Sequence, residues 1–165
     1  MTKPIRLTDN VEIKIRTGMI RDADRLNEIE KACFPSELRY GPSILTTLLS
    51  MTPIYTVLTV HMADDSEILA FAIGEQDDFN ETVGRIITIQ VDPPFWRMGI
   101  GKKLLLELET KLYEEYSIKS FELQVHYKNK RAIRFYQKNG YKIVRLLQNY
   151  YERKEHAYLM EKSSP

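Results

Sequence analysis

The chain has 165 residues, of which 43% are hydrophobic and 28% are charged, a size and composition that suit one globular domain with its own core. Lysine and arginine total 24, aspartate and glutamate total 23, and the net charge is +1. This balance excludes a strong overall field for nucleic acid or an anionic membrane, so an anionic ligand must be bound by a local group of residues.

Targeting signals are absent from the sequence pattern. The N-terminal residues lack the apolar core of a secretory signal, and no stretch approaches the roughly 20 apolar residues of a membrane span. The single cysteine, Cys33, cannot form an internal disulfide, which fits a reducing compartment. We therefore expect a soluble, cytoplasmic protein that does not bind membranes. The apolar neighbours of Cys33 favour a buried thiol over a nucleophile.

The first 51 residues predict one strand and two helices. Residues 11–18 alternate between apolar and polar side chains, which is a strand pattern. In residues 21–34, after Asp22 in a capping position, apolar side chains follow at helical spacing: Ala23, Leu26, Ile29 and Ala32. A second, shorter helix is expected at 42–51, where it is opened by Pro42.

In the remaining chain, helices separate strands only towards the C-terminus. Runs rich in β-branched and aromatic residues predict strands at 54–62, 67–76, 84–94, 120–127, 141–148 and 156–162. Helices are expected from about Gly99 to Tyr116 and over 129–140. We find no repeat, linker or low-complexity tract, so the sequence predicts one mixed α/β domain of the α+β type over residues 1–165.

Two glycines, Gly99 and Gly101, stand where the third of these strands gives way to the long helix. Glycine has no Cβ, so a ligand can approach the backbone closely. The first N–H groups of a helix lack internal partners and carry the positive end of its dipole. Arg97, Lys102 and Lys103 add positive charge. This pattern predicts a phosphate site, although the glycines alone also suit a tight turn.

Two spaced motifs resemble those of the GNAT acetyltransferases. The pyrophosphate loop of that family, Q/R-x-x-G-x-G/A, corresponds to Trp96 to Gly101, with Trp96 in place of Gln or Arg. The family motif N-x-x-A-x-x-x-Y-x-x-x-G-F/Y is matched by Asn129, Ala132, Tyr136, Gly140 and Tyr141. The resemblance covers about residues 11–162. It implies the GNAT fold, a mixed sheet of about seven strands flanked by about four helices, and acetyl-coenzyme A as the cofactor.

The resemblance also assigns cofactor-binding residues. The backbone of Ile89, Gln90 and Val91 would align the pantetheine arm and the acetyl group. The pyrophosphate would be held by Arg97, Met98, Gly99, Ile100, Gly101 and Lys102, and further contacts are expected from Asn129, Tyr136 and Lys138. Asn129 also suits a helix cap, and the two roles can coexist.

Tyr136 is the expected catalytic residue. When an amine attacks the acetyl thioester, the departing thiolate gains charge, and a positioned phenol can supply a hydrogen bond or a proton. The alternative is an aromatic side chain that packs into the core beside Ala132 and Ile133. Gln124 stands five residues before Asn129, where some N-terminal acetyltransferases have a Glu or His base. It cannot take a proton, but it can orient a water.

The acceptor is indicated by the tyrosine pair Tyr150 and Tyr151, which is followed by a charged turn and a last strand. This arrangement is similar to the protein N-terminal acetyltransferases, in which the pair and the loop after the first helix flank the peptide. Here that loop is 34–41 and contains Glu37 and Tyr40. A Tyr-Tyr pair in a strand also suits cross-strand packing alone.

Proton affinity favours an α-amine as acceptor. With a pKa of about 7.8 an α-amine is roughly one tenth neutral at pH 7, whereas lysine at about 10.4 is neutral only about four times in ten thousand. An enzyme without a Glu or His base therefore favours N-termini. The first hypothesis is acetyl transfer from acetyl-coenzyme A to the α-amino group of protein or peptide N-termini, by direct attack in a ternary complex. The alternative acceptors are lysine side chains and small-molecule amines.

A third hypothesis, from a different class, is a module that binds RNA or another polyanion. Its basic cluster would be Lys128, Lys130, Arg131, Arg134 and Lys138. The near-neutral total charge argues against it, and we expect no nucleic-acid partner. The three histidines, His61, His126 and His156, are scattered along the chain, so we also expect no metal.

Overall fold

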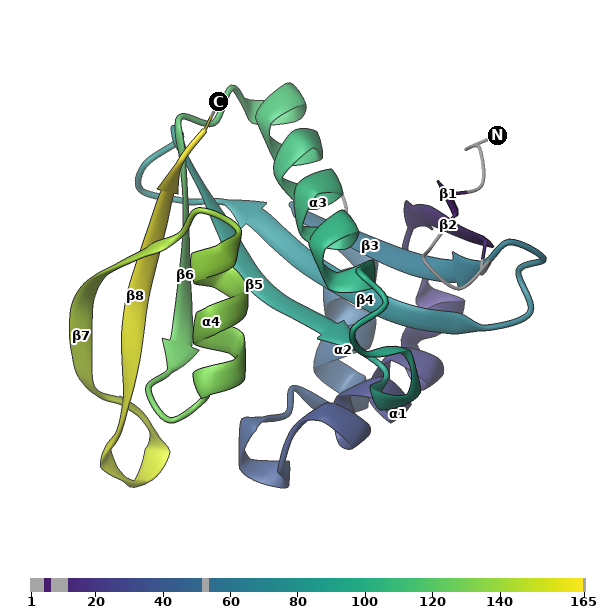
Figure 1. The fold of residues 1–165 in the computed structure, drawn as a ribbon, viewed down its shortest axis with the longest axis horizontal. Helices are drawn as coiled ribbons and strands as arrows, with labels where there is room; N and C mark the ends of the chain where they lie inside the picture. The colour runs from purple at the N-terminus through teal and green to yellow at the C-terminus, as the bar shows by residue number, and fades with distance from the viewer. Residues whose placement is uncertain (1–4, 7–11, 52–53, 165) are drawn as a thin grey trace.

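The computed structural model describes residues 5–6, 12–51 and 54–164. These residues form one eight-stranded sheet, in the order β1-β2-β3-β4-β5-β6-β8-β7 (Figure 1). The strands are β1 (Ile5–Arg6), β2 (Glu12–Thr17), β3 (Tyr55–Met62), β4 (Ile68–Gln76), β5 (Val83–Val91), β6 (Ser120–His126), β7 (Lys142–Tyr151) and β8 (Glu155–Ser163). Neighbouring strands are antiparallel, except that β5 and β6 are parallel.

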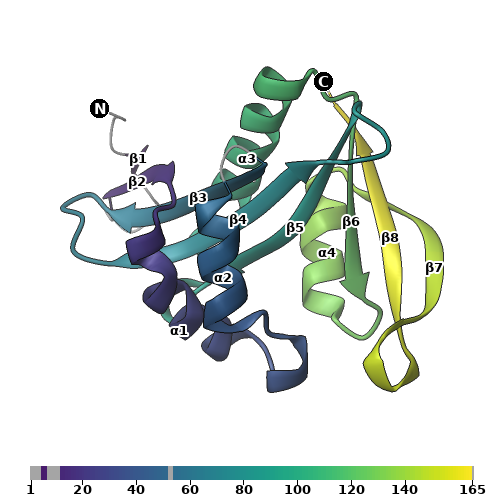
Figure 2. The same cartoon turned by 180° about the vertical axis from the view of Figure 1, so that it is seen from behind.

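Helices cover the two faces of this sheet. They are α1 (Ala23–Cys33), α2 (Gly41–Ser50), α3 (Ile100–Tyr116) and α4 (Lys130–Lys138). α3 and α4 lie on one face, and α1 and α2 lie on the other (Figures 1 and 2). The mixed sheet of about seven strands flanked by about four helices is thus confirmed, with the two-residue β1 as an additional strand that the sequence did not predict.

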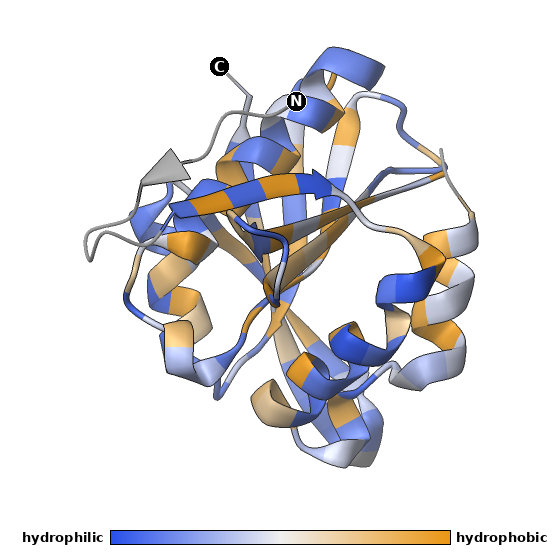
Figure 3. Ribbon diagram, turned by 90° about the vertical axis from the view of Figure 1, so that its right-hand side faces the viewer, coloured by the Kyte–Doolittle hydropathy of each residue, from blue (hydrophilic) through white to orange (hydrophobic). Residues whose placement is uncertain are grey.

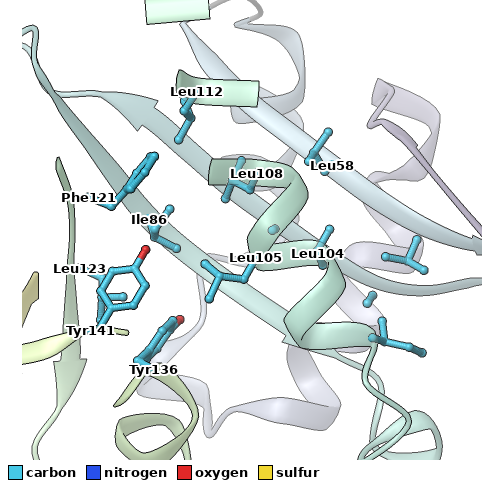
Figure 4. Close-up of a cluster of buried hydrophobic side chains, with 14 of the residues drawn as sticks. Leu58, Ile86, Leu104, Leu105, Leu108, Leu112, Phe121, Leu123, Tyr136 and Tyr141 are labelled. Atoms are coloured by element: carbon cyan, nitrogen blue, oxygen red, sulfur yellow. The ribbon is translucent and has the colours of Figure 1, made fainter. Parts of the chain in front are cut away.

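Each helix buries an apolar stripe against the sheet, and hydrophilic residues alternate with it along the helix (Figure 3). The predicted stripe of α3 is buried and packs with Phe121 of β6 and Tyr141 (Figure 4): Ile100, Leu104, Leu105, Leu108 and Leu112. A second cluster on the opposite face joins α1 and α2 to β3 and β4, with Leu26, Ile29, Leu45 and Phe71 among its members. Ala32 of the predicted α1 pattern is exposed instead.

Asp22 stands at the predicted N-cap position of α1, but its side chain does not cap the helix. Residues Ile20–Asp22 form a 3-10 turn, so the Asp22 backbone is already helical (φ −82°, ψ −14°) and its side chain makes no capping bond. The carboxylate accepts hydrogen bonds from Arg16 Nη1 (2.8 Å), Arg16 Nη2 (2.9 Å) and the Met19 amide (2.8 Å). It therefore fixes the strand-to-helix connection rather than the helix end.

β5 and β6 diverge along their length. They pair only through Val83–Ser120, Gly84–Phe121 and Arg85–Glu122, although β5 continues to Val91 and β6 to His126. A register shift opposite Ile73 and Gly74 marks an irregularity in β5 just after this pairing ends. The sheet opens between the two strands towards the end at which α3 and α4 begin (Figure 1).

Candidate active site

The opening between β5 and β6 brings together the ends of three predicted site segments. Ile89, Gln90 and Val91 form the last part of β5, beyond its pairing with β6. The first turn of α3 lies beside them, since a Cβ placed on Gly101 would be 3.6 Å from Val91 Cγ2. It would also be 3.5 Å from Phe135 Cε2, so α4 reaches the same place.

The start of α3 presents free backbone amides. The first helical bond runs from the Lys103 amide to the Gly99 carbonyl oxygen (3.2 Å), so the N–H groups of Ile100, Gly101 and Lys102 come before it. Arg97, with φ +68°, and Gly99, with φ +83°, turn the loop into the helix. The side chains of Arg97 and Lys102 are exposed, and that of Met98 is half-buried. These amides and cations suit a phosphate group.

Gly99 and Gly101 differ in whether the backbone conformation favours glycine at that position. Gly99 adopts the left-handed conformation, which favours glycine whatever the ligand. Gly101 does not, and a Cβ there would meet Phe135 and Val91 only at ordinary contact distances. Internal packing therefore does not require glycine at 101, whereas close approach of a ligand to the backbone explains it. The residues at this helix start fit the diphosphate of coenzyme A.

Asn129 is the N-cap of α4. Its Oδ1 accepts a hydrogen bond from the Ala132 amide (3.1 Å), so the capping interpretation is confirmed. Lys138 is exposed in the last turn of α4, about 13 Å along the helix from Asn129 at 1.5 Å per residue. The structure thus does not bring Lys138 next to the start of α4.

Tyr136 is buried, with 8% of its surface exposed, and belongs to the main core as the packing interpretation expects. Its ring makes edge contacts with Tyr141 (5.6 Å between centroids) and Phe135 (5.2 Å; Figure 4 labels Tyr136 and Tyr141). Burial raises the pKa of the phenol, and the charges of Tyr151 and Tyr40 raise it further. The hydroxyl therefore stays protonated, as a hydrogen-bond donor requires.

Gln124 lies on the other side of the sheet from Tyr136. It alternates along β6 with Leu123 and Val125, which are buried in the core beneath α3 and α4. Its half-buried side chain is therefore on the same face as α1 and α2. The two predicted catalytic side chains come from opposite faces near the opening.

Of the three predicted tyrosines of the acceptor side, Tyr150 and Tyr151 pack against each other, and Tyr40 lies within electrostatic range of both. Tyr150 and Tyr151 meet edge to face with centroids 5.0 Å apart, and Tyr151 lies 5.3 Å from the His126 ring. Burial, then the charges of Tyr150 and Tyr40, raise the pKa of Tyr151 to about 12. Burial, then the charge of Tyr150, also raises the pKa of Tyr40. The loop after α1 thus lies near the end of β7, close enough for Tyr40 and Tyr150 to affect each other electrostatically.

Glu37 of the same loop is exposed and accepts a hydrogen bond from Ser36 Oγ (2.8 Å). The residue that fixes this loop is Glu30 of α1, which sequence reasoning missed. It is fully buried, and its two carboxylate oxygens accept the amides of Tyr40 (2.8 Å) and Gly41 (2.9 Å). Its position four residues after Leu26, on the buried side of α1, was the available signal.

Two polar side chains lie at the end of β5: the buried Gln90 within the strand and the half-buried Cys33 beside it. Cys33 Sγ donates to the Val91 carbonyl oxygen (3.3 Å), and burial raises the pKa of this half-buried thiol to about 11, in keeping with the buried-thiol interpretation. Gln90 is 2% exposed and donates from Nε2 to Thr88 Oγ1 (3.1 Å). Its Oε1 has no hydrogen-bond partner among the described residues.

A metal site and a membrane-spanning helix are both absent from the described ranges. There, no three His, Cys, Asp or Glu side chains come together as a metal site. Over the same ranges, no helix is long and apolar enough to cross a membrane.

Known proteins share this fold and these motifs. The model of the acetyltransferase (GNAT) family matches residues 23–141. An uncharacterized N-acetyltransferase of Methanocaldococcus jannaschii is 32% identical over 152 residues, 92% of each chain. An N-alpha-acetyltransferase of Sulfurisphaera tokodaii is 27% identical over 158 residues, 90% of this chain and 92% of the relative. The crystal structure of Ard1 from Thermoplasma volcanium has a TM-score of 0.80 at 27% identity, covering 93% of this chain and 98% of that one. The chain therefore belongs to the GNAT family and is an acetyl-CoA-dependent N-acetyltransferase.

Proposed function

We propose that this enzyme acetylates the α-amino groups of protein or peptide N-termini. The observation that carries the proposal is the packing of Tyr150 against Tyr151 at the end of β7, with Tyr40 of the loop after α1 near enough to raise the pKa of Tyr151. The relatives named N-alpha-acetyltransferase support the same acceptor. In this proposal the three phenols and Glu37 flank the first residues of the peptide.

On the cofactor side, the proposed residues would bind acetyl-CoA and orient its acetyl group. The backbone of Ile89 to Val91 would align the pantetheine arm, the helix start from Arg97 to Lys102 would hold the diphosphate, and Asn129, Tyr136 and Lys138 would add contacts. When bound, acetyl-CoA supplies the acetyl thioester. Burial keeps Tyr136 Oη protonated, so this hydroxyl would donate a hydrogen bond to the leaving sulfur.

On the acceptor side, Gln124 orients a water that takes the proton from the attacking amine. Its place on the sheet face opposite Tyr136 suits an amine that arrives from one side while the leaving group departs on the other. A weak proton acceptor of this kind suffices for an α-amine, of which roughly a tenth is neutral at pH 7.

The test uses acetyl-CoA and a panel of peptides that differ in their first residue. Released coenzyme A is followed with a thiol reagent, and fragmentation mass spectrometry locates the acetyl group. We expect acetylation at the α-amine. A peptide with a blocked N-terminus and a free lysine is the matched control and should stay unmodified. Equal modification of that control would favour the lysine acceptor, and no modification of any free N-terminus would overturn the proposal.

A further inference from the structure

We propose that Arg131 supplies the cofactor diphosphate with the side-chain contact that the family loop takes from Gln or Arg at position 96, and that Trp96 holds Arg131 in place. This inference rests on the use of acetyl-CoA and not on the identity of the acceptor. Trp96, which departs from the loop motif, and Arg131, which belongs to the basic cluster on α4, are distant in the sequence but in contact in the structure.

Trp96 forms a fixed platform in the loop before α3. Its indole Nε1 donates to the Val91 carbonyl oxygen at the end of β5, which holds the ring against the opening in the sheet. The ring is 38% exposed. Arg131 of α4 covers it, with Cζ only 3.3 Å from the ring centroid. A guanidinium stacked on an aromatic face is held by electrostatic attraction and dispersion.

The stacked guanidinium keeps its N–H groups for another partner. An aromatic face uses none of the five N–H donors at the edge of the guanidinium. In the described ranges, no carboxylate lies within ion-pair distance of Arg131. The neighbouring Lys128, in contrast, is paired with Glu155 (2.9 Å). Arg131 is thus an exposed cation whose guanidinium is held on one face by Trp96, with N–H groups that can bind an anion.

α4 places this cation beside the free amides of α3. Arg131 and Phe135 are one helical turn apart on the same side of α4, and Phe135 lies next to Gly101. One turn is about 5.4 Å, within the reach of a guanidinium and of a diphosphate. The cation and the amide groups therefore converge on one anion, and Arg binds phosphate oxygens with two parallel hydrogen bonds.

The first experiment measures Kd by calorimetry for two probes, coenzyme A and 3′-dephospho-coenzyme A. We expect Arg131→Ala to raise both Kd values by about tenfold or more, because a charge-assisted contact to the shared diphosphate is lost. Arg134→Ala is the matched control, since it removes the same charge from an exposed position of the same helix. Its Kd values should stay within about twofold of the parent protein. Thermal unfolding checks that each variant is folded.

A second experiment tests the role of Trp96. Trp96→Leu should weaken binding as much as Arg131→Ala, and the double variant should be no weaker than either single one, because both remove the same contact. Trp96→Arg in the Arg131→Ala background should restore affinity to within about threefold. An Arg131→Ala protein that binds both probes as well as the parent would overturn the proposal. So would a loss seen with coenzyme A alone, since the contact would then be to the 3′-phosphate.

Discussion

Tyr136 combines a ring that belongs to the core with a hydroxyl to which we assign, as a proposal, the hydrogen bond to the leaving group. Tyr136→Phe keeps the ring and its contacts with Phe135 and Tyr141, so only the hydroxyl is lost. We expect turnover to fall by about a hundredfold or more and the Kd for acetyl-CoA to stay within about threefold. Steady-state rates and calorimetry measure the two quantities.

The matched control is Tyr141→Phe. The Tyr141 hydroxyl donates to the buried carboxylate of Glu109 (2.8 Å), so its loss should lower stability but leave turnover nearly unchanged. An unchanged turnover number for Tyr136→Phe would remove that residue from the chemistry.

Cys33 is expected to be unreactive in the folded enzyme. Burial raises its pKa from 9.0 to about 11, so at pH 8 the thiolate fraction is about one in a thousand, against about one in ten after unfolding. The fraction rises with pH, so alkylation by iodoacetamide should accelerate between about pH 8 and 11. Mass spectrometry with and without urea measures the two rates. Rapid labelling of the folded protein at pH 8 would contradict the buried-thiol interpretation.

At the scale of the element, the two glycines at the start of α3 differ: Gly99 has a positive φ, whereas Gly101 is helical and has no conformational or packing reason to be glycine. Gly99→Ala forces a side chain into the left-handed region and should lower the free energy of unfolding by about 1–2 kcal/mol. Gly101→Ala is the control, because that site is helical and open to a methyl group. It should leave stability unchanged or raise it by up to about 1 kcal/mol. Urea unfolding measures both, and equal losses would refute the distinction.

The loop that carries Tyr40 depends on the end of α1. Glu30→Gln preserves the shape of the side chain, but its amide nitrogen cannot accept a hydrogen bond, so one of the two loop amides loses its partner. We expect the KM for peptide to rise about tenfold or more while the Kd for acetyl-CoA changes little.

Glu28→Gln, on the exposed side of α1, is the control for this effect. It removes only a surface ion pair with Arg25 (3.2 Å), which is worth about 0–1 kcal/mol. Equal peptide KM values for the two variants would show that Glu30 does not position the loop.

Helices and strands could be predicted from the sequence where the local spacing of apolar residues determines them. The helices and the longer strands lie within a few residues of their predicted ranges, because apolar spacing and proline or glycine stops are local properties. β1 was missed because its two residues carry no periodicity. The glycines, Asn129 and Tyr136 were predicted as site residues through motifs, and their roles stay predictions. Glu30 and the Trp96–Arg131 stack were not, since these contacts arise only when distant segments pack together.

At the scale of the whole molecule, the order of the strands decides where the site forms. The last strand, β8, lies between β6 and β7, and β6 meets β5 only along three residue pairs. No local pattern reveals such a partial pairing. It places the start of α3, the start of α4 and the loop after α1 around one opening.

The charge of the whole chain argues against the RNA-binding hypothesis. The net charge is +1, and within the predicted basic cluster Lys128 is already paired with Glu155. We expect no retention of labelled single-stranded RNA at micromolar protein and about 150 mM salt in a filter-binding assay. Salt-sensitive retention that coenzyme A fails to displace would revive that hypothesis.

Trp96 is the only tryptophan in the chain, and its indole lies against a cation at the mouth of the site. Excitation at a wavelength that spares tyrosine therefore yields emission from this one place. The emission maximum and the fluorescence intensity should change when a nucleotide displaces solvent around the indole ring. The intrinsic fluorescence of Trp96 can therefore report cofactor binding in a stopped-flow instrument without an added dye.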